Sequence, residues 1–112
     1  MYFIYIIRCR PDVLYTGITT DVRRRMNEHA GRSEKGAKFT RSHEVLSIEA
    51  LWSAPDRSTA SKLEAALKKL PRSRKDELIA GAGLAEVFGG ETAEKYSRVP
   101  AAEYADVFGG KK

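Results

Sequence analysis

Two ionisable side chains occupy positions where a helix should carry apolar ones. Asp21 is a suitable N-cap for a helix that begins at Val22. The core-facing positions of this predicted helix, spaced i, i+3, i+4 and i+7, are Val22, Arg25, Met26 and His29. A guanidinium is costly to remove from water, so Arg25 must either face a cleft or meet an anion. The pattern indicates a cation directed at a negatively charged group.

A carboxylate interrupts the apolar stripe of a second predicted helix. That stripe consists of Ala60, Leu63, Leu67 and Leu70, and Glu64 lies four residues after the first of them. An unpaired buried charge is strongly destabilising. Three interpretations remain open: Glu64 pairs with a buried cation such as Arg25, it binds a metal ion, or it forms a structural salt bridge at the helix edge.

Two tyrosines are predicted to lie side by side on a β-hairpin. The aromatic and β-branched run at residues 1–7 is typical of a buried strand, residues 10–12 have turn chemistry, and residues 13–18 form the partner strand. In an odd-with-odd register Ile7 faces Tyr15 and Tyr5 faces Gly17, which leaves room above the glycine. Packing alone also explains either tyrosine taken singly.

The remaining elements follow from periodicity and from helix stop signals. Residues 31–44 are polar and basic and are predicted to form a surface loop, with a short helical turn near Phe39 as an option. Residues 45–52 alternate as a third strand, with Ile48, Ala50 and Trp52 on one side. Either Asp56 or Ser58 caps the next helix, which ends near residue 70 before a proline, and residues 73–80 form another helix.

Composition favours one small basic domain. The 112 residues carry a net charge of +5, and residues 1–80 alone carry +6, which favours polyanionic partners. The single cysteine, Cys9, excludes an internal disulfide and a cysteine-based zinc site, so a reducing cytoplasm is expected. The apolar start is short and is followed by Arg8, which excludes a signal peptide and a membrane span.

Taken together, the motifs resemble the GIY-YIG endonuclease domain, in its small stand-alone bacterial branch. The likeness covers about residues 2–80 and rests on the order and spacing of Phe3-Ile4-Tyr5, Tyr15-Thr16-Gly17, Asp21-Val22, Arg25, His29 and Glu64. It implies an α/β fold of the α+β type, a three-stranded antiparallel sheet flanked by helices in the order strand, strand, helix, strand, helix, helix. The implied division is a nuclease domain at 1–82 and a C-terminal extension at 83–112.

The resemblance also implies an activity and a role for each residue. The domain would hydrolyse DNA phosphodiesters with one divalent ion, Mg²⁺ or Mn²⁺, held by Glu64 alone. Arg25 would hold the scissile phosphate, and Tyr5 and Tyr15 would position the attacking water, one of them as base. Nearby cations, including His29, are expected to lower the phenol pKa. His29 would either help to position the catalytic side chains or transfer a proton.

The sequence departs from the family pattern at three points. Phe3 replaces the glycine of the first triplet, and Thr16 replaces the isoleucine of the second. The asparagine that many members carry after the glutamate is missing, because the only asparagine is Asn27. A catalytically weak DNA-binding or DNA-damage-associated module is therefore the main alternative, and a protein-interaction adaptor has the least support.

Basic residues suggest how DNA would be held. The expected contacts are Gly17, Arg24, Lys38, Arg41, Lys68, Lys69 and Arg72. Such charges grip the backbone without reading bases, so low sequence specificity and a preference for single-stranded or branched DNA are expected. Any one of these lysines is equally well explained as a solvated surface charge.

The C-terminal extension contains a repeat without chemistry. The hexapeptide at residues 85–90 recurs with one change at 105–110. Its phenylalanines are expected to dock on the domain or on a protein partner. The whole protein is predicted to be a monomer or weak dimer in the bacterial cytoplasm, acting on nucleoid DNA.

Overall fold

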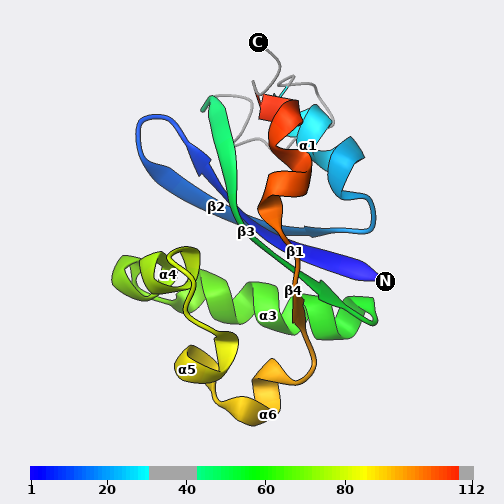
Figure 1. Cartoon of the computed structure of the whole chain (residues 1–112), viewed down its shortest axis with the longest axis vertical. Helices are drawn as coiled ribbons and strands as arrows, with labels where there is room; N and C mark the ends of the chain where they lie inside the picture. Colours follow the sequence, from blue (N-terminus) through cyan, green and yellow to red (C-terminus); the bar gives the residue numbers. More distant parts are fainter. Residues whose placement is uncertain (31–42, 109–112) are drawn as a thin grey trace.

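Four antiparallel strands form one sheet, and helices cover both of its faces (Figure 1). The computed structural model describes residues 1–30 and 43–108. The strands are β1 (Tyr2–Cys9), β2 (Val13–Thr19), β3 (Val45–Ala54) and β4 (Ser97–Arg98), in the order β2-β1-β3-β4. The helices are α1 (Val22–Ala30), α3 (Arg57–Lys69), α4 (Arg72–Ile79), α5 (Leu84–Phe88), α6 (Gly90–Ala93) and the 3-10 helix η1 (Ala101–Phe108). Among the described residues, β1 to α4 follow the predicted order of strand, strand, helix, strand, helix, helix. Most of the loop predicted for residues 31–44, including Lys38, Phe39 and Arg41, lies in residues 31–42, outside the described residues.

The hairpin register agrees with the sequence pattern. Ile7 pairs with Tyr15, and Tyr5 pairs with Gly17. Since a one-residue slip would turn every side chain to the other face, this register fixes which face carries both tyrosines.

The prediction of a three-stranded sheet is wrong by one strand. The C-terminal segment supplies β4, which pairs with β3 through Trp52 opposite Arg98 and Ser53 opposite Ser97. A strand of two residues has no readable alternation, so only the packing of this segment against β3 creates it.

A bulge in β3 also overturns the simple alternation predicted for that strand. The pairing with β1 passes from Ile6 opposite Ala50 to Ile7 opposite Ile48, which leaves Glu49 as the extra residue. Ile48 therefore packs on the face that holds Leu51, instead of sharing a face with Ala50.

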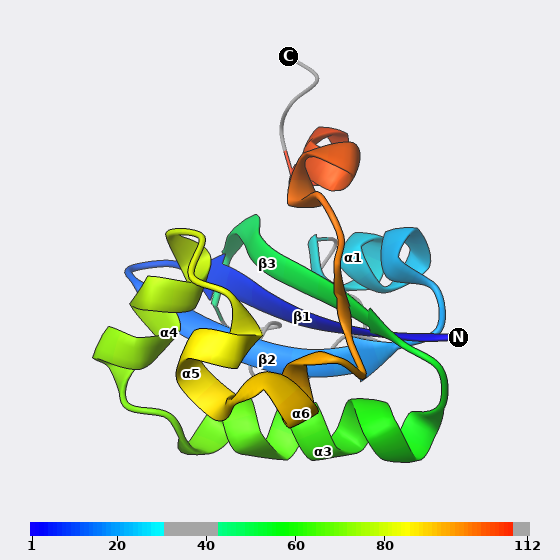
Figure 2. The same cartoon turned by 60° about the horizontal axis from the view of Figure 1, so that its bottom comes forward.

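Each face of the sheet has its own core. On one face α3 packs its buried Ala60, Leu63 and Leu67 against a cluster that includes Ile4, Ile6, Ala50 and Trp52. On the other face α1 packs Val22 and Met26 against Tyr5, Ile7, Cys9 and Leu51. Figure 2 shows α3 and α1 on opposite sides of the sheet, with η1 beside α1.

The C-terminal repeat is divided between these two cores. Val87 and Phe88 pack against the α3-side cluster, whereas Val107 packs against the α1-side cluster. The same sequence thus covers opposite faces of one sheet.

Asp56, and not Ser58, caps α3, because its carboxylate accepts a hydrogen bond from the Thr59 amide at 2.8 Å. We expect Asp56→Ala to lower the free energy of unfolding by about 1 kcal/mol, since a helix amide loses its acceptor. Ser58→Ala, at an exposed neighbouring position, should change it by less than about 0.5 kcal/mol. Urea denaturation measures both, and equal effects would contradict this assignment of the cap.

Candidate active site

The Tyr5 hydroxyl is the centre of the candidate site. The tyrosine is 1% exposed, and a Cβ at Gly17 would lie 2.4 Å from its hydroxyl oxygen. The ring therefore passes directly over the glycine of the neighbouring strand. Since β2 is an edge strand, the hydroxyl reaches the margin of the sheet.

Helix α1 brings two polar side chains to that hydroxyl. Asp21 begins the helix as predicted, accepting the Arg24 amide at 3.1 Å. The Tyr5 hydroxyl lies 2.9 Å from Nε2 of His29 and is hydrogen-bonded to Arg25. Because a guanidinium only donates, Tyr5 accepts from Arg25, and it donates to His29 in the tautomer that carries no proton on Nε2.

The second tyrosine joins the same cluster. The Tyr15 ring centroid lies 5.9 Å from that of His29, and the Tyr5 ring centroid lies 5.6 Å from it, both edge-on. The four side chains Tyr5, Tyr15, Arg25 and His29 are thus gathered on the α1 side of the sheet.

Burial dominates the electrostatics of this cluster. It raises the pKa of Tyr5 to about 12, while the hydrogen bond from Arg25 opposes the rise. Burial also lowers the pKa of His29 to about 4. Arg25 lowers the pKa of the Tyr5 phenol as expected, but burial outweighs it. Both groups are therefore neutral at pH 7, and the expectation that His29 contributes as a cation is wrong.

Glu64 approaches from the opposite face. Helix α3 packs against the edge strand β2, and the Glu64 charge makes a minor contribution, after burial and Arg25, to the shifted pKa of Tyr5. Its side chain is 23% exposed and pairs with Lys68 at 3.2 Å. The observed partner is therefore a surface lysine one helical turn away.

Few protein side chains near Glu64 could bind a metal ion together with it. Among residues 1–30 and 43–108 no group of three or more His, Cys, Asp or Glu side chains could hold a metal ion. A single accessible carboxylate suits a hard cation such as Mg²⁺, which keeps most of its waters. The residues present therefore fit an ion bound mainly by water and substrate.

Glu28 is a residue that the sequence analysis missed. Its carboxylate is 14% exposed and accepts from Arg25 at 2.9 Å and from Arg24 at 3.0 Å. The hydrogen bond from Arg25 keeps the pKa of Glu28 below its usual value. The i+3 and i+4 spacing was the available signal, and the contact fixes the direction of the Arg25 side chain.

The other expected DNA contacts are dispersed. Gly17 lies beneath the Tyr5 ring, and Lys69 is exposed on α3. Arg72 is engaged by Asp12 at 3.0 Å and by Asp76 at 3.1 Å, which ties α4 to the β1–β2 turn.

The C-terminal segment supports α1 from its other flank. Arg23 pairs with Asp106 at 2.8 Å and donates to the Glu103 carbonyl at 3.1 Å. Its guanidinium also lies 5.3 Å from the Tyr104 ring centroid. Helix α1 is therefore held between η1 on the Arg23 side and the tyrosines on the Arg25 side.

Comparison with known proteins shows the family of this chain. Residues 1–77 match the family model of the GIY-YIG catalytic domain. The chain therefore belongs to the GIY-YIG family, a family of nuclease domains, and the resemblance drawn from motif spacing is confirmed.

Small bacterial proteins are similar to this chain. UPF0213 protein YhbQ of Escherichia coli is 46% identical over 89 residues, which cover 77% of this chain and 85% of that protein. UPF0213 protein DP2720 of Desulfotalea psychrophila is 45% identical over 78 residues, covering 70% of each. The solution NMR structure of UPF0213 protein BH0048 from Bacillus halodurans is 33% identical, covers 84% of this chain and 94% of that chain, and has a TM-score of 0.43.

No helix among the described residues is long and apolar enough to cross a membrane.

Gly17→Ala should displace the Tyr5 ring, because the new methyl group would overlap the hydroxyl. We expect a loss of about 1–3 kcal/mol in the free energy of unfolding. Gly83→Ala is the matched control, since its φ is −77° and its added Cβ would have no neighbour closer than 4.0 Å. Denaturation midpoints compare the two, and a Gly17→Ala protein as stable as the control would refute the close approach.

Burial of neutral His29 predicts a specific acid sensitivity. Between pH 6.5 and about 4 the unfolded chain binds a proton that the folded imidazole refuses, so stability falls as pH falls through this window. The share of His29 approaches about 1.4 kcal/mol per pH unit. His29→Gln keeps every carboxylate, so its stability should fall less steeply from pH 6.5 to 4.5 in thermal melts. Parallel curves for the two proteins would contradict the neutral state.

Proposed function

We propose that this protein is a divalent-metal-dependent DNA endonuclease of low sequence specificity that prefers single-stranded or branched DNA. The observation that carries the proposal is the cluster of Tyr5, Tyr15, Arg25 and His29 under electrostatic influence of Glu64. These groups belong to a domain of a nuclease family.

Arg25 binds the scissile phosphate in this proposal. A phosphodiester repels nucleophiles, so an enzyme must neutralise its charge as the transition state forms. The Arg25 side chain is 23% exposed and is oriented by Glu28. A guanidinium held in that way offers its remaining donors to two phosphate oxygens.

Tyr5 and His29 provide a path for the proton of the attacking water. With its pKa raised to about 12, Tyr5 keeps its proton unless another base receives it. His29 is neutral and lies 2.9 Å away. The water gives its proton to the Tyr5 oxygen while the Tyr5 proton moves to Nε2 of His29, and the new P–O bond replaces the bond to the leaving alkoxide. Tyr15 holds the water from the side.

Glu64 would hold one Mg²⁺ or Mn²⁺ beside this path. When bound, such an ion supplies Lewis-acid stabilisation of the phosphate and of the leaving oxygen. Lys68 shares the Glu64 carboxylate in the structure, but its side chain is 54% exposed and free to turn toward a DNA phosphate instead.

Backbone contacts account for the low specificity. Arg24, Lys68 and Lys69 lie exposed on the two helices that carry the site. Cations of this kind position a strand without distinguishing its bases. Arg72 and Arg24 each have two carboxylate partners, so both would contribute less to DNA binding than exposed Lys69.

The alternative is a DNA-binding module with little turnover. Two observations favour it: the only asparagine, Asn27, is exposed on α1, and the resting Tyr5 is a weak base. This alternative predicts that the protein binds DNA and does not cleave it with either Mg²⁺ or Mn²⁺ present.

The substitution Glu64→Gln distinguishes a DNA endonuclease from a DNA-binding module with little turnover. With labelled single-stranded and flapped DNA, we expect the wild-type chain to cleave in Mg²⁺ or Mn²⁺ and not in EDTA. The substitution removes the proposed metal ligand and should slow cleavage by about 10²-fold or more. Glu77→Gln is the control, because Glu77 is also helical and pairs with a basic neighbour, Arg74, at 2.8 Å. Equal cleavage by wild type and Glu64→Gln would refute the endonuclease assignment, and binding without cleavage would support the alternative.

A further inference from the structure

The helix that carries the candidate site depends on the C-terminal segment for its position. Helix α1 has nine residues and buries Val22, Met26 and His29, and an isolated helix of this length is at best marginally stable in water. One of the three buried groups is a polar imidazole, which costs free energy to remove from water. Among the described elements, the backbone of α1 packs most extensively against η1, more than against any strand. Yet η1 lies outside the residues that match the family model.

Arg23 makes the polar contacts between α1 and η1. Its guanidinium pairs with Asp106 at 2.8 Å, donates to the Glu103 carbonyl at 3.1 Å and lies 5.3 Å from the centroid of the Tyr104 ring. Two residues along an α-helix correspond to a rotation of about 200°, so Arg23 and Arg25 leave α1 on opposite sides. Arg23 can therefore act on the candidate site only through the placement of the helix.

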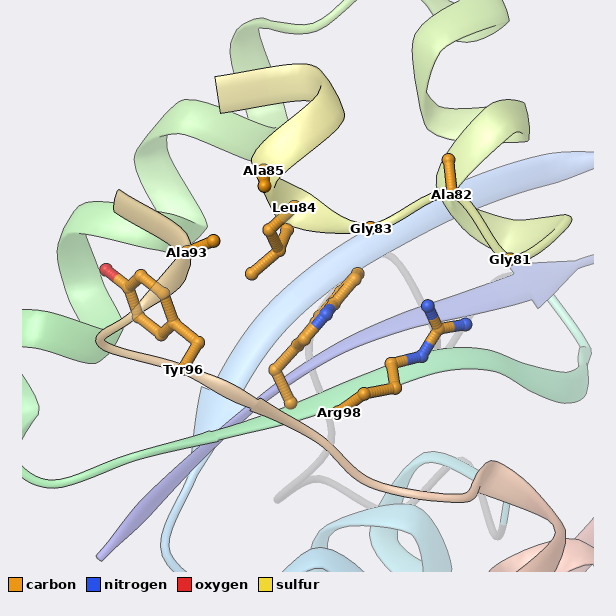
Figure 3. A pocket seen from close by; sticks show the side chains of 9 residues that line it. Gly81, Ala82, Gly83, Leu84, Ala85, Ala93, Tyr96 and Arg98 are labelled. Atoms are coloured by element: carbon orange, nitrogen blue, oxygen red, sulfur yellow. The ribbon is translucent and has the colours of Figure 1, made fainter. Parts of the chain in front are cut away.

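The other end of this connection lies next to Tyr5. The Val99 amide, just before η1, donates to the Leu51 carbonyl at 2.9 Å, and Leu51 faces Tyr5 in the pairing of β1 with β3. Upstream, Tyr96 lines a hollow beside β4 (Figure 3), and its hydroxyl donates to the Thr59 carbonyl at 2.7 Å. The segment thus forms a continuous link from the sheet beside Tyr5 to α1.

The docking of η1 is shallow, so the contacts of Arg23 make up a large share of it. None of residues 101–107 is fully buried. Tyr104 and Val107 pack against the cluster on the α1 side but stay partly exposed. An exposed ion pair by itself contributes little to stability, but here a carboxylate, a carbonyl and an aromatic ring all contact one guanidinium. Breaking these contacts is therefore expected to loosen η1 on α1 while both cores stay closed.

We propose that Arg23 is a positioning residue, and that residues 96–107 belong to the catalytic unit. Through its contacts with η1, Arg23 fixes the distance between α1 and the strand that carries Tyr5. That distance determines whether Nε2 of His29 stays at 2.9 Å from the Tyr5 hydroxyl, and whether Arg25 reaches the phosphate. The kinetic part of this inference rests on the proposed nuclease activity, whereas the geometric part is measured without DNA.

The substitution Arg23→Asp tests the proposal without damaging α1. An acidic residue is favourable in the first turn of a helix, and the first turn of α1 has none, so the change breaks the contact with Asp106 but not the helix. The readout is the titration of His29 by NMR in the full chain without DNA, assigned with the His29→Gln protein. We expect the pKa of His29, about 4 in the wild type, to rise toward 6.5 as the imidazole gains water.

Charge-matched variants separate the position of α1 from a direct effect of charge. Asp106→Asn breaks the same contact at a side chain that is 62% exposed, so this protein is expected to fold. Loss of a negative charge alone would lower the pKa of His29, so a rise reports movement of α1. The double exchange Arg23→Asp with Asp106→Arg keeps the net charge and should restore the wild-type pKa. Arg57→Asp, at an exposed arginine that begins α3, should leave the pKa of His29 unchanged.

Cleavage of labelled single-stranded DNA in Mg²⁺ or Mn²⁺ gives the second readout. We expect kcat of the Asp106→Asn protein to fall about tenfold or more, because a small misplacement of reacting groups slows the chemical step strongly. KM should change by less than about threefold, since the phosphate contacts themselves remain. A wild-type protein that does not cleave would refute the proposed function, and the titration of His29 would still decide whether Arg23 positions α1.

Three results would overturn the proposal. The first is a pKa of His29 that is unchanged in both Arg23→Asp and Asp106→Asn. The second is a double exchange that recovers neither the pKa nor kcat. The third is a fall of kcat in Arg57→Asp equal to that in Arg23→Asp, which would assign the effect to net charge.

Discussion

The passage of the Tyr5 ring over Gly17 is the contact on which the candidate site depends. The phenol can reach the sheet margin only because the residue opposite it has no side chain. At that margin the hydroxyl meets His29 and Arg25 from α1, and the charge of Glu64 on α3 adds a small contribution to its raised pKa. Any side chain on the glycine would overlap the Tyr5 hydroxyl and force the ring to move.

Burial at this contact changes the pKa values of Tyr5 and His29. Removing Tyr5 and His29 from water raises the pKa of the phenol to about 12 and lowers the pKa of the imidazole to about 4, so both are neutral at pH 7 and neither is a ready base. Their 2.9 Å hydrogen bond links them, and in the proposed reaction the two act together as the acceptor of the water proton. The charge needed for phosphoryl chemistry must then come from Arg25, from the phosphate and from an ion at Glu64.

The C-terminal segment acts on both sides of the sheet. Through Arg23, Tyr104 and Asp106 it braces α1, which carries Arg25 and His29. Through β4 and Tyr96, whose hydroxyl donates to the Thr59 carbonyl at 2.7 Å, it also packs over α3 and β3.

The sequence by itself determined the elements that local chemistry controls. Period and capping specified the hairpin, α1 and α3, and the inward positions of Arg25 and Glu64 stood out because charges interrupted apolar stripes. Even the Tyr5–Gly17 register was readable, since alternation leaves few choices. Only tertiary structure decided the bulge at Glu49, the addition of β4 and the partners of each charge. The bulge, the fourth strand and the charge partners depend on which surfaces pack against each other in the fold and on how much water each group loses there. The spacing of residues along a single helix or strand does not indicate either of these.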